Sequence, residues 1–167
     1  MLLIEDLQVK LGEREVLRHI DLQINAGETH ILFGPNGSGK TSLLMTIMGY
    51  PQYRVTAGKI TFKGVDITNL PINERAKLGI GMSYQRPPTV NGLKTRQMVQ
   101  ICAGERDVDV EGMASRMNFT DFLERDINAG FSGGEIKRSE LVQLMAQQPD
   151  LLLFDEPESG VDLENIA

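Results

Sequence analysis

Residues 34–41 read Gly34-Pro35-Asn36-Gly37-Ser38-Gly39-Lys40-Thr41, which matches the pattern G-x-x-x-x-G-K-[ST]. The apolar run from Thr29 to Phe33 precedes this segment and predicts a buried strand. Apolar residues at helical spacing follow it until Gly49, and Pro51 forbids further helix. A glycine-rich loop between a strand and a helix is the setting in which this pattern binds phosphate.

The residue types of this loop suit a polyphosphate held together with a metal ion. Glycines let the backbone turn its N–H groups inward, and the N-terminus of the following helix adds positive potential. Lys40 supplies a point charge between the outer phosphates, and Thr41 is placed to bind Mg²⁺. The predicted phosphate site consists of Gly34, Pro35, Asn36, Gly37, Ser38, Gly39, Lys40, Thr41 and Ser42.

A second element places two carboxylates at the end of a predicted apolar strand, Leu151 to Phe154. Adjacent residues on a strand point in opposite directions, so Asp155 and Glu156 cannot serve one identical role. We expect Asp155 to hold Mg²⁺ and Glu156 to activate the attacking water as a general base. Acidic residues that only cap a strand at the surface are the alternative.

A third element, Phe131-Ser132-Gly133-Gly134-Glu135, precedes a patterned helix that ends before Pro149. A small, glycine-rich turn at a helix N-terminus is another potential anion site. Because the chain already has one phosphate loop, we interpret this turn as a contact to nucleotide held by a partner subunit. A simple helix cap is the alternative.

Length, charge and cysteine content narrow the classes of protein. The 167 residues suit one compact domain or a two-part unit, and 17 Lys and Arg against 23 Asp and Glu give a net charge of −6. This acidic balance provides no general attraction to nucleic acid. The single Cys102 fits a reducing compartment, and no apolar run approaches the roughly 20 residues of a membrane span. We therefore expect a cytoplasmic protein with no nucleic-acid partner and no direct membrane insertion.

An antiparallel β-subdomain is predicted at the start of the chain. Residues 2–25 alternate apolar and polar positions, with Leu3 and Leu7 among the apolar ones, and Gly12 begins a turn between two strands. Residues 59–64 have the pattern of an edge strand.

The rest of the chain predicts an α/β core with an inserted helical segment. Residues 78–84 predict a core strand that ends at Gln85, and short helical patterns occupy residues 86–130. Apolar strands separated by helices are typical of a parallel sheet covered on both faces. We therefore predict a nucleotide-binding core of residues 1–85 and 131–167, with a small helical subdomain at residues 86–130.

The order of these motifs resembles that of the ATP-binding-cassette ATPases: residues 34–41, Gln85, residues 131–135, residues 151–156 and Ser159-Gly160-Val161-Asp162. The resemblance implies a P-loop NTPase cassette, ATP with Mg²⁺, and a head-to-tail homodimer. In such a dimer, Ser132, Gly133 and Gly134 contact the ATP of the other copy. It also implies that Gln85 senses Mg²⁺ and the attacking water, and that Asp162 communicates across the dimer.

Within this family, several segments resemble the SufC group, the soluble ATPases of the Suf iron–sulfur cluster assembly system. These segments include residues 49–58, Phe131, residues 134–138 and residues 159–162. The resemblance implies SufB- and SufD-like scaffold partners, in which ATP hydrolysis drives a conformational change. Two alternatives stay open: the nucleotide-binding subunit of an ABC membrane transporter, and a chain that binds nucleotide or scaffold without hydrolysis.

The family continues beyond Ala167, through a further strand with a switch histidine, whereas His19 and His30 both lie upstream of the motifs. We therefore expect the C-terminal part of the cassette to be missing, with roughly 70 to 90 further residues in the natural protein. The 167-residue chain alone is expected to be a weak or inactive ATPase.

Overall fold

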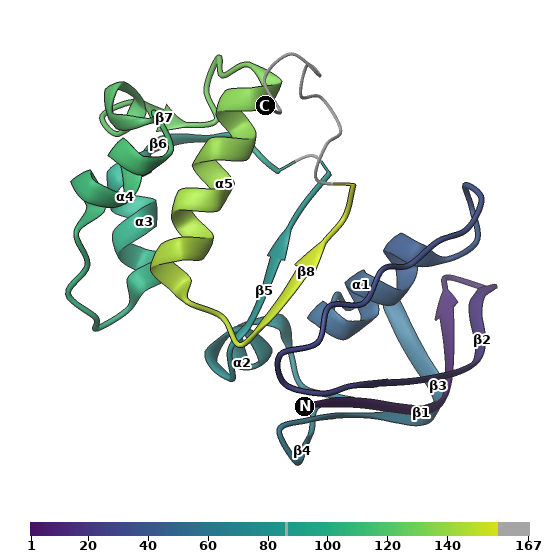
Figure 1. Ribbon diagram of the computed structural model, residues 1–167. Helices are drawn as coiled ribbons and strands as arrows, with labels where there is room; N and C mark the ends of the chain where they lie inside the picture. Colours follow the sequence, from purple (N-terminus) through teal and green to yellow (C-terminus); the bar gives the residue numbers. More distant parts are fainter. Residues whose placement is uncertain (86, 157–167) are drawn as a thin grey trace. The chain divides into compact units, whose positions relative to one another are not determined.

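The computed structural model describes residues 1–85 and 87–156 (Figure 1). The chain divides into two compact units, Met1–Leu78 and Gly79–Ala167. Both units contain helices and strands, so the predicted α/β class is confirmed. None of the helices in the described part is long and apolar enough to cross a membrane.

A four-stranded antiparallel sheet forms the framework of the first unit, in the order β2-β1-β3-β4. Its strands are β1 (Leu2–Leu11), β2 (Arg14–Ile24), β3 (Tyr53–Phe62) and β4 (Val65–Asp66). The antiparallel pair predicted for residues 2–25 is confirmed, because Leu2 lies opposite Ile24 and Leu11 lies opposite Arg14.

A bulge in β1 changes which apolar side chains reach the core. Asp6 has a φ of +45°, and the pairing with β2 shifts register between Ile4 and Leu7. Since side chains alternate along a strand, the shift buries Leu2 and Ile4 before the bulge and Leu7 after it. The regular alternation that placed Leu3 with Leu7 was therefore wrong, and Leu3 is exposed.

Strand β3 is an inner strand, which corrects the edge strand predicted at residues 59–64. It begins at Tyr53 and pairs with β1 along most of its length. On its other side, Thr61 and Phe62 pair with β4 after a tight turn. The edge prediction failed because β4 has only two residues and leaves no recognisable pattern.

Helix α1 (Lys40–Met48) follows the loop at residues 34–41, as predicted, and ends at Gly49. A second, short helix, α2 (Ile72–Lys77), carries the buried Arg75. The Arg75 Nη1 donates to the carbonyl oxygens of Thr46 and Ile47 at 2.8 and 2.9 Å. These carbonyls belong to the last turn of α1, where helical donors run out, and Thr46 O accepts only one further bond that the structure records, from the Gly49 N–H at 3.1 Å. Burial lowers the pKa of Arg75 to about 10, so the side chain stays charged at neutral pH.

The apolar run from Thr29 to Phe33 is not a strand, which corrects the buried strand predicted there. Phe33 is 89% exposed and Ile31 is 71% exposed. A strand needs backbone partners on a neighbouring segment, and in residues 1–85 and 87–156 no strand pairs with this run. A turn precedes this run, in which the Glu28 N–H donates to Asn25 O at 3.3 Å.

The second unit holds a parallel pair of strands, β5 (Ile80–Ser83) and β8 (Leu151–Phe154). Ile80 lies opposite Leu151, and Ser83 lies opposite Phe154. Helix α5 (Gly133–Gln147) leads into β8 (Figure 1). It packs against β5, where Gln147 Nε2 donates to Ile80 O at 3.1 Å.

One face of β8 is exposed within the described part of the chain. Leu151 and Leu153 are buried, whereas Leu152 and Phe154 are 42% and 45% exposed. The predicted core strand is thus present and parallel to β5, but the prediction that both of its faces are covered does not hold for these residues.

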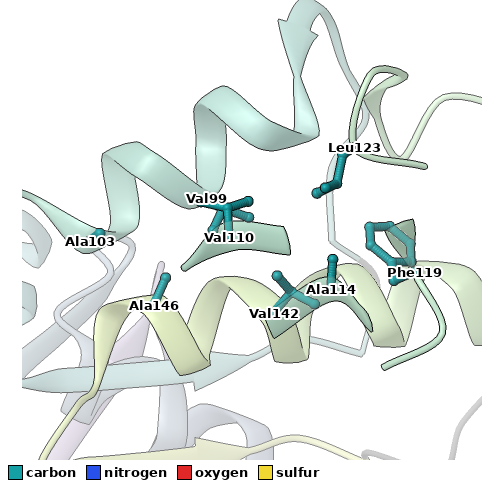
Figure 2. Close-up of a cluster of buried hydrophobic side chains, with 8 residues drawn as sticks. All are labelled: Val99, Ala103, Val110, Ala114, Phe119, Leu123, Val142 and Ala146. Carbon is teal, nitrogen blue, oxygen red and sulfur yellow. The ribbon is translucent and has the colours of Figure 1, made fainter. Parts of the chain in front are cut away.

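The segment predicted to be helical contains α3 (Thr95–Ala103), α4 (Val110–Arg116) and the 3-10 turn η1 (Thr120–Phe122). Together with α5 these elements enclose a hydrophobic cluster, shown in Figure 2. Its members are Val99, Ala103, Val110, Ala114, Phe119, Leu123, Val142 and Ala146. Because Val142 and Ala146 belong to α5, the inserted segment and α5 share one core.

A two-stranded antiparallel ribbon, β6 (Val90–Lys94) with β7 (Asp126–Ile127), was not predicted. The Lys94 ammonium donates to Asp126 Oδ1 at 2.8 Å, which ties the two strands together. Such short strands leave no alternation that a sequence pattern can detect. The division into a core and a subdomain at residues 86–130 stays a prediction.

Candidate active site

The loop at residues 34–41 closes around the side chain of Lys40. Its Nζ donates to the carbonyl oxygens of Gly34 and Pro35 at 2.8 and 3.1 Å. The Ser38 N–H also donates to Pro35 O, at 3.2 Å. Phosphate oxygens are stronger acceptors for an ammonium than neutral carbonyls. The loop therefore holds Lys40 where a phosphate can replace its present acceptors.

The N-terminus of α1 has no side-chain cap. Gly39 precedes it with a φ of +100°, and Gly37 has a φ of +81°, conformations that glycine adopts at little cost. A Cβ on Gly39 would lie 3.0 Å from a methyl carbon of Leu17. The first turn, which includes Thr41 and Ser42, thus presents backbone N–H groups at the positive end of the helix dipole. This arrangement fits phosphate oxygens.

Gln85 and Glu156 meet beyond the carboxyl ends of β5 and β8. Ser83 and Phe154 lie opposite each other in the parallel pair of strands. Gln85 comes two residues after Ser83, and Glu156 comes two residues after Phe154. Equal offsets on neighbouring parallel strands bring the two side chains together. The Gln85 Nε2 donates to Glu156 Oε2 at 2.5 Å, and both residues are exposed. Two residues predicted to act on water are thus in direct contact.

Asp155 and Glu156 lie in different environments, as predicted for neighbours on a strand. Asp155 is 5% exposed and shares the buried face of Leu153. Its N–H donates to Ser83 O at 3.2 Å, which extends the contact between the strands by one residue. Because Glu156 is exposed, only this second carboxylate is open to water in the described part of the site.

Ser132 caps helix α5. Its Oγ accepts from the Glu135 N–H at 3.4 Å, and its own N–H donates to Glu135 Oε2 at 2.7 Å, which forms a capping box. The hydrogen bond from the Ser132 N–H contributes most to lowering the pKa of the Glu135 carboxyl. The Ser132 side chain and the charges of Arg125 and Arg138 lower this pKa further. The helix cap weighed as an alternative is therefore present. Ser132 and Gly133 stay exposed, so the cap leaves this terminus accessible.

An aromatic and cationic cluster supports the segment before α5. The Arg125 guanidinium lies over the rings of Phe122 and Phe131, 5.2 and 4.8 Å from their centroids. Its Nη2 also donates to the carbonyl oxygens of Ala129 and Gly130 at 3.1 and 3.3 Å. These contacts fix the backbone just ahead of the Ser132 cap.

Sequence reasoning missed a buried polar group on α5. Glu140 is 6% exposed, and Lys137, one turn earlier, donates to Glu140 Oε2 at 3.1 Å. A usable signal was present, since Lys137, Glu140 and the buried Leu144 recur at helical spacing and share one face. Charged residues on an apolar stripe indicate a buried ion pair.

The residues predicted to bind Mg²⁺ supply suitable oxygen donors. Among residues 1–85 and 87–156, no three His, Cys, Asp or Glu side chains cluster closely enough to hold a metal by themselves. Mg²⁺ commonly binds one or two protein oxygens together with waters and substrate phosphates, and the hydroxyl of Thr41, the amide oxygen of Gln85 and the carboxylate of Asp155 are each a donor of this kind. The predicted Asp162 lies outside the described residues.

Comparison with known proteins decides the family. The family described as "ABC transporter" matches residues 17–159. The chain belongs to the ABC transporter family. A solved structure of a nucleotide-free ATP-binding cassette from an ABC transporter shares this fold, with a TM-score of 0.78 at 22% identity. The match covers 96% of this chain and 70% of that one.

Several curated relatives are named as transporters, and one is named for iron–sulfur cluster assembly. "Probable ATP-dependent transporter ycf16" of Cyanidium caldarium is 38% identical, over 98% of this chain and 70% of the relative. "Probable ATP-dependent transporter SufC" of Escherichia coli is 35% identical, over 98% and 72%. "Iron-sulfur cluster assembly protein SufC" of Plasmodium falciparum is 36% identical, over 92% and 49%. This ABC ATPase is therefore similar to SufC proteins.

Proposed function

We propose that this chain is a cytoplasmic, ATP-hydrolysing cassette subunit that drives conformational change in a SufB/SufD-like scaffold for iron–sulfur cluster assembly. The observation that carries the hydrolytic part is the 2.5 Å contact between the Gln85 amide and the Glu156 carboxylate. The name of the Plasmodium relative supports the assignment to cluster assembly.

Nucleotide binding is assigned to residues 34–42. Lys40 would leave the carbonyl oxygens of Gly34 and Pro35 for the outer phosphates of ATP, because anionic oxygens are the stronger acceptors. The uncapped first turn of α1 would donate its backbone N–H groups to the same phosphates. Thr41, Gln85 and Asp155 would hold Mg²⁺, in part through water. When bound, Mg²⁺ neutralises charge on the transferring phosphoryl group.

Hydrolysis is assigned to Glu156 and Gln85. Glu156 would accept a proton from water while the water oxygen bonds to the γ-phosphorus and the bond to the ADP oxygen breaks. An N–H that donates to a carboxylate favours its ionised form and weakens it as a base. We therefore interpret the Gln85–Glu156 contact as a resting arrangement, from which the Gln85 amide moves to the attacking water.

A head-to-tail homodimer is part of the proposal. Each chain has a phosphate loop and a second helix terminus at Ser132, Gly133 and Gly134, where Ser132 and Gly133 are exposed. These residues would contact the ATP held by the second copy, and Asp162 would communicate between the two sites. Both contacts would form only when ATP is present.

The deciding experiment measures phosphate release in the presence and absence of the proposed scaffold. The full chain is incubated with Mg-ATP, with and without a SufB/SufD-like scaffold complex, and free phosphate is measured. We expect hydrolysis that rises in the presence of the scaffold. ATP binding without phosphate release, with or without scaffold, would contradict the enzymatic part and leave a nucleotide-binding subunit.

The transporter relatives' names favour a second candidate, the nucleotide-binding subunit of an ABC transporter. The chemistry is the same, but the partner is a membrane protein. Capture from detergent-solubilised membranes distinguishes the two candidates. Hydrolysis that responds to an integral membrane partner, and not to the scaffold, would replace cluster assembly with transport.

A further inference from the structure

The segment around Gln85 is held on both sides, by helix α5 before it and by the segment that leads into α5 after it. Before Gln85, the Tyr84 N–H donates to Glu140 Oε1 at 2.8 Å. After Gln85, the Asn128 Nδ2 donates to Pro88 O at 2.8 Å. Glu140 lies in α5, which Ser132 begins, and Asn128 lies just ahead of that helix. The position of Gln85 therefore depends on two side chains that are distant in the sequence.

Tyr84, the residue before Gln85, has both of its backbone polar groups held by α5. Its N–H donates to Glu140 Oε1, and its carbonyl oxygen accepts from the Lys137 ammonium. The regular pairing of β5 with β8 ends one residue earlier, at Ser83. At Tyr84, side chains of α5 therefore provide the hydrogen-bond partners that a neighbouring strand would otherwise provide. They fix the orientation of the peptide units on either side of Tyr84.

Glu140 joins these contacts into one buried group. Its Oε2 accepts from Ser83 Oγ at 2.9 Å and from Lys137 Nζ at 3.1 Å, while Oε1 accepts from Tyr84. A buried carboxylate is tolerated only when it is paired and hydrogen-bonded, and Glu140 meets both conditions. Because several partners fix the carboxylate, it holds Tyr84 more rigidly than a single surface contact would.

We propose that Glu140 is a positioning residue, which holds the backbone before Gln85 so that the Gln85 amide lies beside the Glu156 carboxylate at rest and can reach the attacking water during hydrolysis. The inference rests on the proposed hydrolytic function, for which the Gln85–Glu156 contact is the central observation. Loss of the Glu140 carboxylate removes the acceptor of the Tyr84 N–H, so the backbone position of Gln85, the next residue, is no longer fixed. Misplacement of a catalytic group by about 1 Å can cost on the order of 10²-fold in rate.

A kinetic test compares three variants of the full chain. Glu140→Gln keeps the shape and one acceptor oxygen, Ser83→Ala removes a single donor to Glu140, and Glu105→Gln is the matched change at an exposed glutamate. We expect kcat to fall on the order of 10- to 10²-fold for Glu140→Gln, and less for Ser83→Ala. KM for Mg-ATP should stay within about twofold in both, because the phosphate loop is untouched. Glu105→Gln should be unchanged.

A double-variant cycle separates positioning from general destabilisation. With Glu156→Gln already present, Glu140→Gln should cause no further loss of kcat, because the side chain that Gln85 meets is already altered. Independent, multiplicative losses in the double variant would overturn the proposal. So would a wild-type kcat for Glu140→Gln.

A structural readout works even if the chain does not hydrolyse ATP. The side-chain amide of Gln85 is assigned by ¹⁵N–¹H NMR, with Gln85→Ala to identify its signals. In Glu140→Gln we expect these signals to shift toward those of a glutamine amide without a carboxylate partner, and in Glu105→Gln we expect them to stay in place. Unshifted Gln85 signals in folded Glu140→Gln would refute the positioning role, whatever the outcome for the proposed function.

Discussion

The buried guanidinium of Arg75 donates to the carbonyl oxygen of Thr46 at 2.8 Å, and so fastens α2 to the last turn of α1. The same side chain also donates to the carbonyl oxygens of Ile47, Leu70 and Thr68, at 2.9, 2.7 and 3.0 Å. Since α1 begins with Lys40, Arg75 fixes the far end of the helix that carries the phosphate loop.

Replacing Arg75 by Met should therefore destabilise the protein more than any exposed change on the same helix. The substitution keeps an unbranched apolar chain but removes the charged donors of four carbonyl groups. We expect the free energy of unfolding to fall by about 2–4 kcal/mol. Urea unfolding measures the change, and the exposed Lys77→Met is the control, expected within about 0.5 kcal/mol of the parent. Equal effects of the two changes would disprove a special role of Arg75.

Lys40→Ala should weaken ATP binding strongly. The variant removes the ammonium that the loop holds through Gly34 and Pro35. A hydrogen bond to a charged group contributes about 1.5–3 kcal/mol, so Kd should rise on the order of 10- to 10²-fold. Isothermal titration with Mg-ATP provides the measurement, with the exposed Lys59→Ala as control. An unchanged Kd for Lys40→Ala would remove residues 34–41 from the nucleotide site.

Glu156→Gln should separate binding from hydrolysis. The amide keeps the shape of the carboxylate but cannot accept a proton from water. We expect unchanged ATP affinity and a kcat that falls by at least about 10²-fold. Phosphate release by Glu105→Gln, an equal change at an exposed site, should match the parent. Normal turnover in Glu156→Gln would assign the general base to another residue.

The turn before the phosphate loop should lose stability in acid. Hydrogen bonds from the Asn25 side chain, and then from its backbone N–H, lower the pKa of Glu28 from 4.5 to about 2. A carboxyl whose pKa is lower in the folded state adds stability above its unfolded pKa, and this stability is lost as the pH falls toward the folded value. The contribution should therefore be complete above about pH 4.5 and disappear near pH 2.

The measurement compares urea midpoints of the parent chain and Glu28→Gln across this pH range. We expect a constant difference above about pH 4.5, which narrows on acidification. Glu13→Gln, an exposed change in another turn, should show no such narrowing. A difference that is independent of pH would show that the Glu28 charge does not stabilise the turn.

The sequence predicted an element correctly where the spacing of its own apolar residues, and the residues that begin and end it, were enough to define it. The helix predicted from Lys40 to Gly49 matches α1 closely, and α3 is one of the short helices predicted within residues 86–130. The contact of Gln85 with Glu156 also agrees with the sequence, because two strands of a parallel sheet were predicted to end beside these residues. In these cases the information needed was local.

The errors arise where the outcome depends on a distant partner. The run from Thr29 to Phe33 is apolar enough for a strand, but strand formation requires a neighbouring segment that this pattern cannot reveal. Arg75 and Glu140 also have distant partners: Arg75 donates to carbonyl groups 28 and 29 residues away, and Glu140 accepts from groups 56 and 57 residues away. Only tertiary structure shows that carbonyl, hydroxyl and amide groups surround these side chains.

Scaffold binding is expected to depend on the segment that follows Gln85. Pro88, Thr89 and Asn91 are exposed, and proline restricts the backbone, so residues 88–91 present a preformed surface. The bond from Asn128 to Pro88 O connects the same surface to the approach to α5. A partner bound here would act directly beside the Gln85–Glu156 contact, which is why we place the coupling site in residues 86–91.

Exchange of residues 86–91 for a Gly-Ser sequence of equal length should abolish scaffold binding and leave the Kd for Mg-ATP within about twofold, because residues 34–42 are untouched. The control exchanges residues 104–107, an exposed turn away from this surface, and should bind normally. Analytical ultracentrifugation with a SufB/SufD-like complex measures binding. If the scaffold binds the exchanged chain with the parent affinity, the coupling site lies elsewhere. Loss of both scaffold and ATP binding would instead indicate a folding role for residues 86–91.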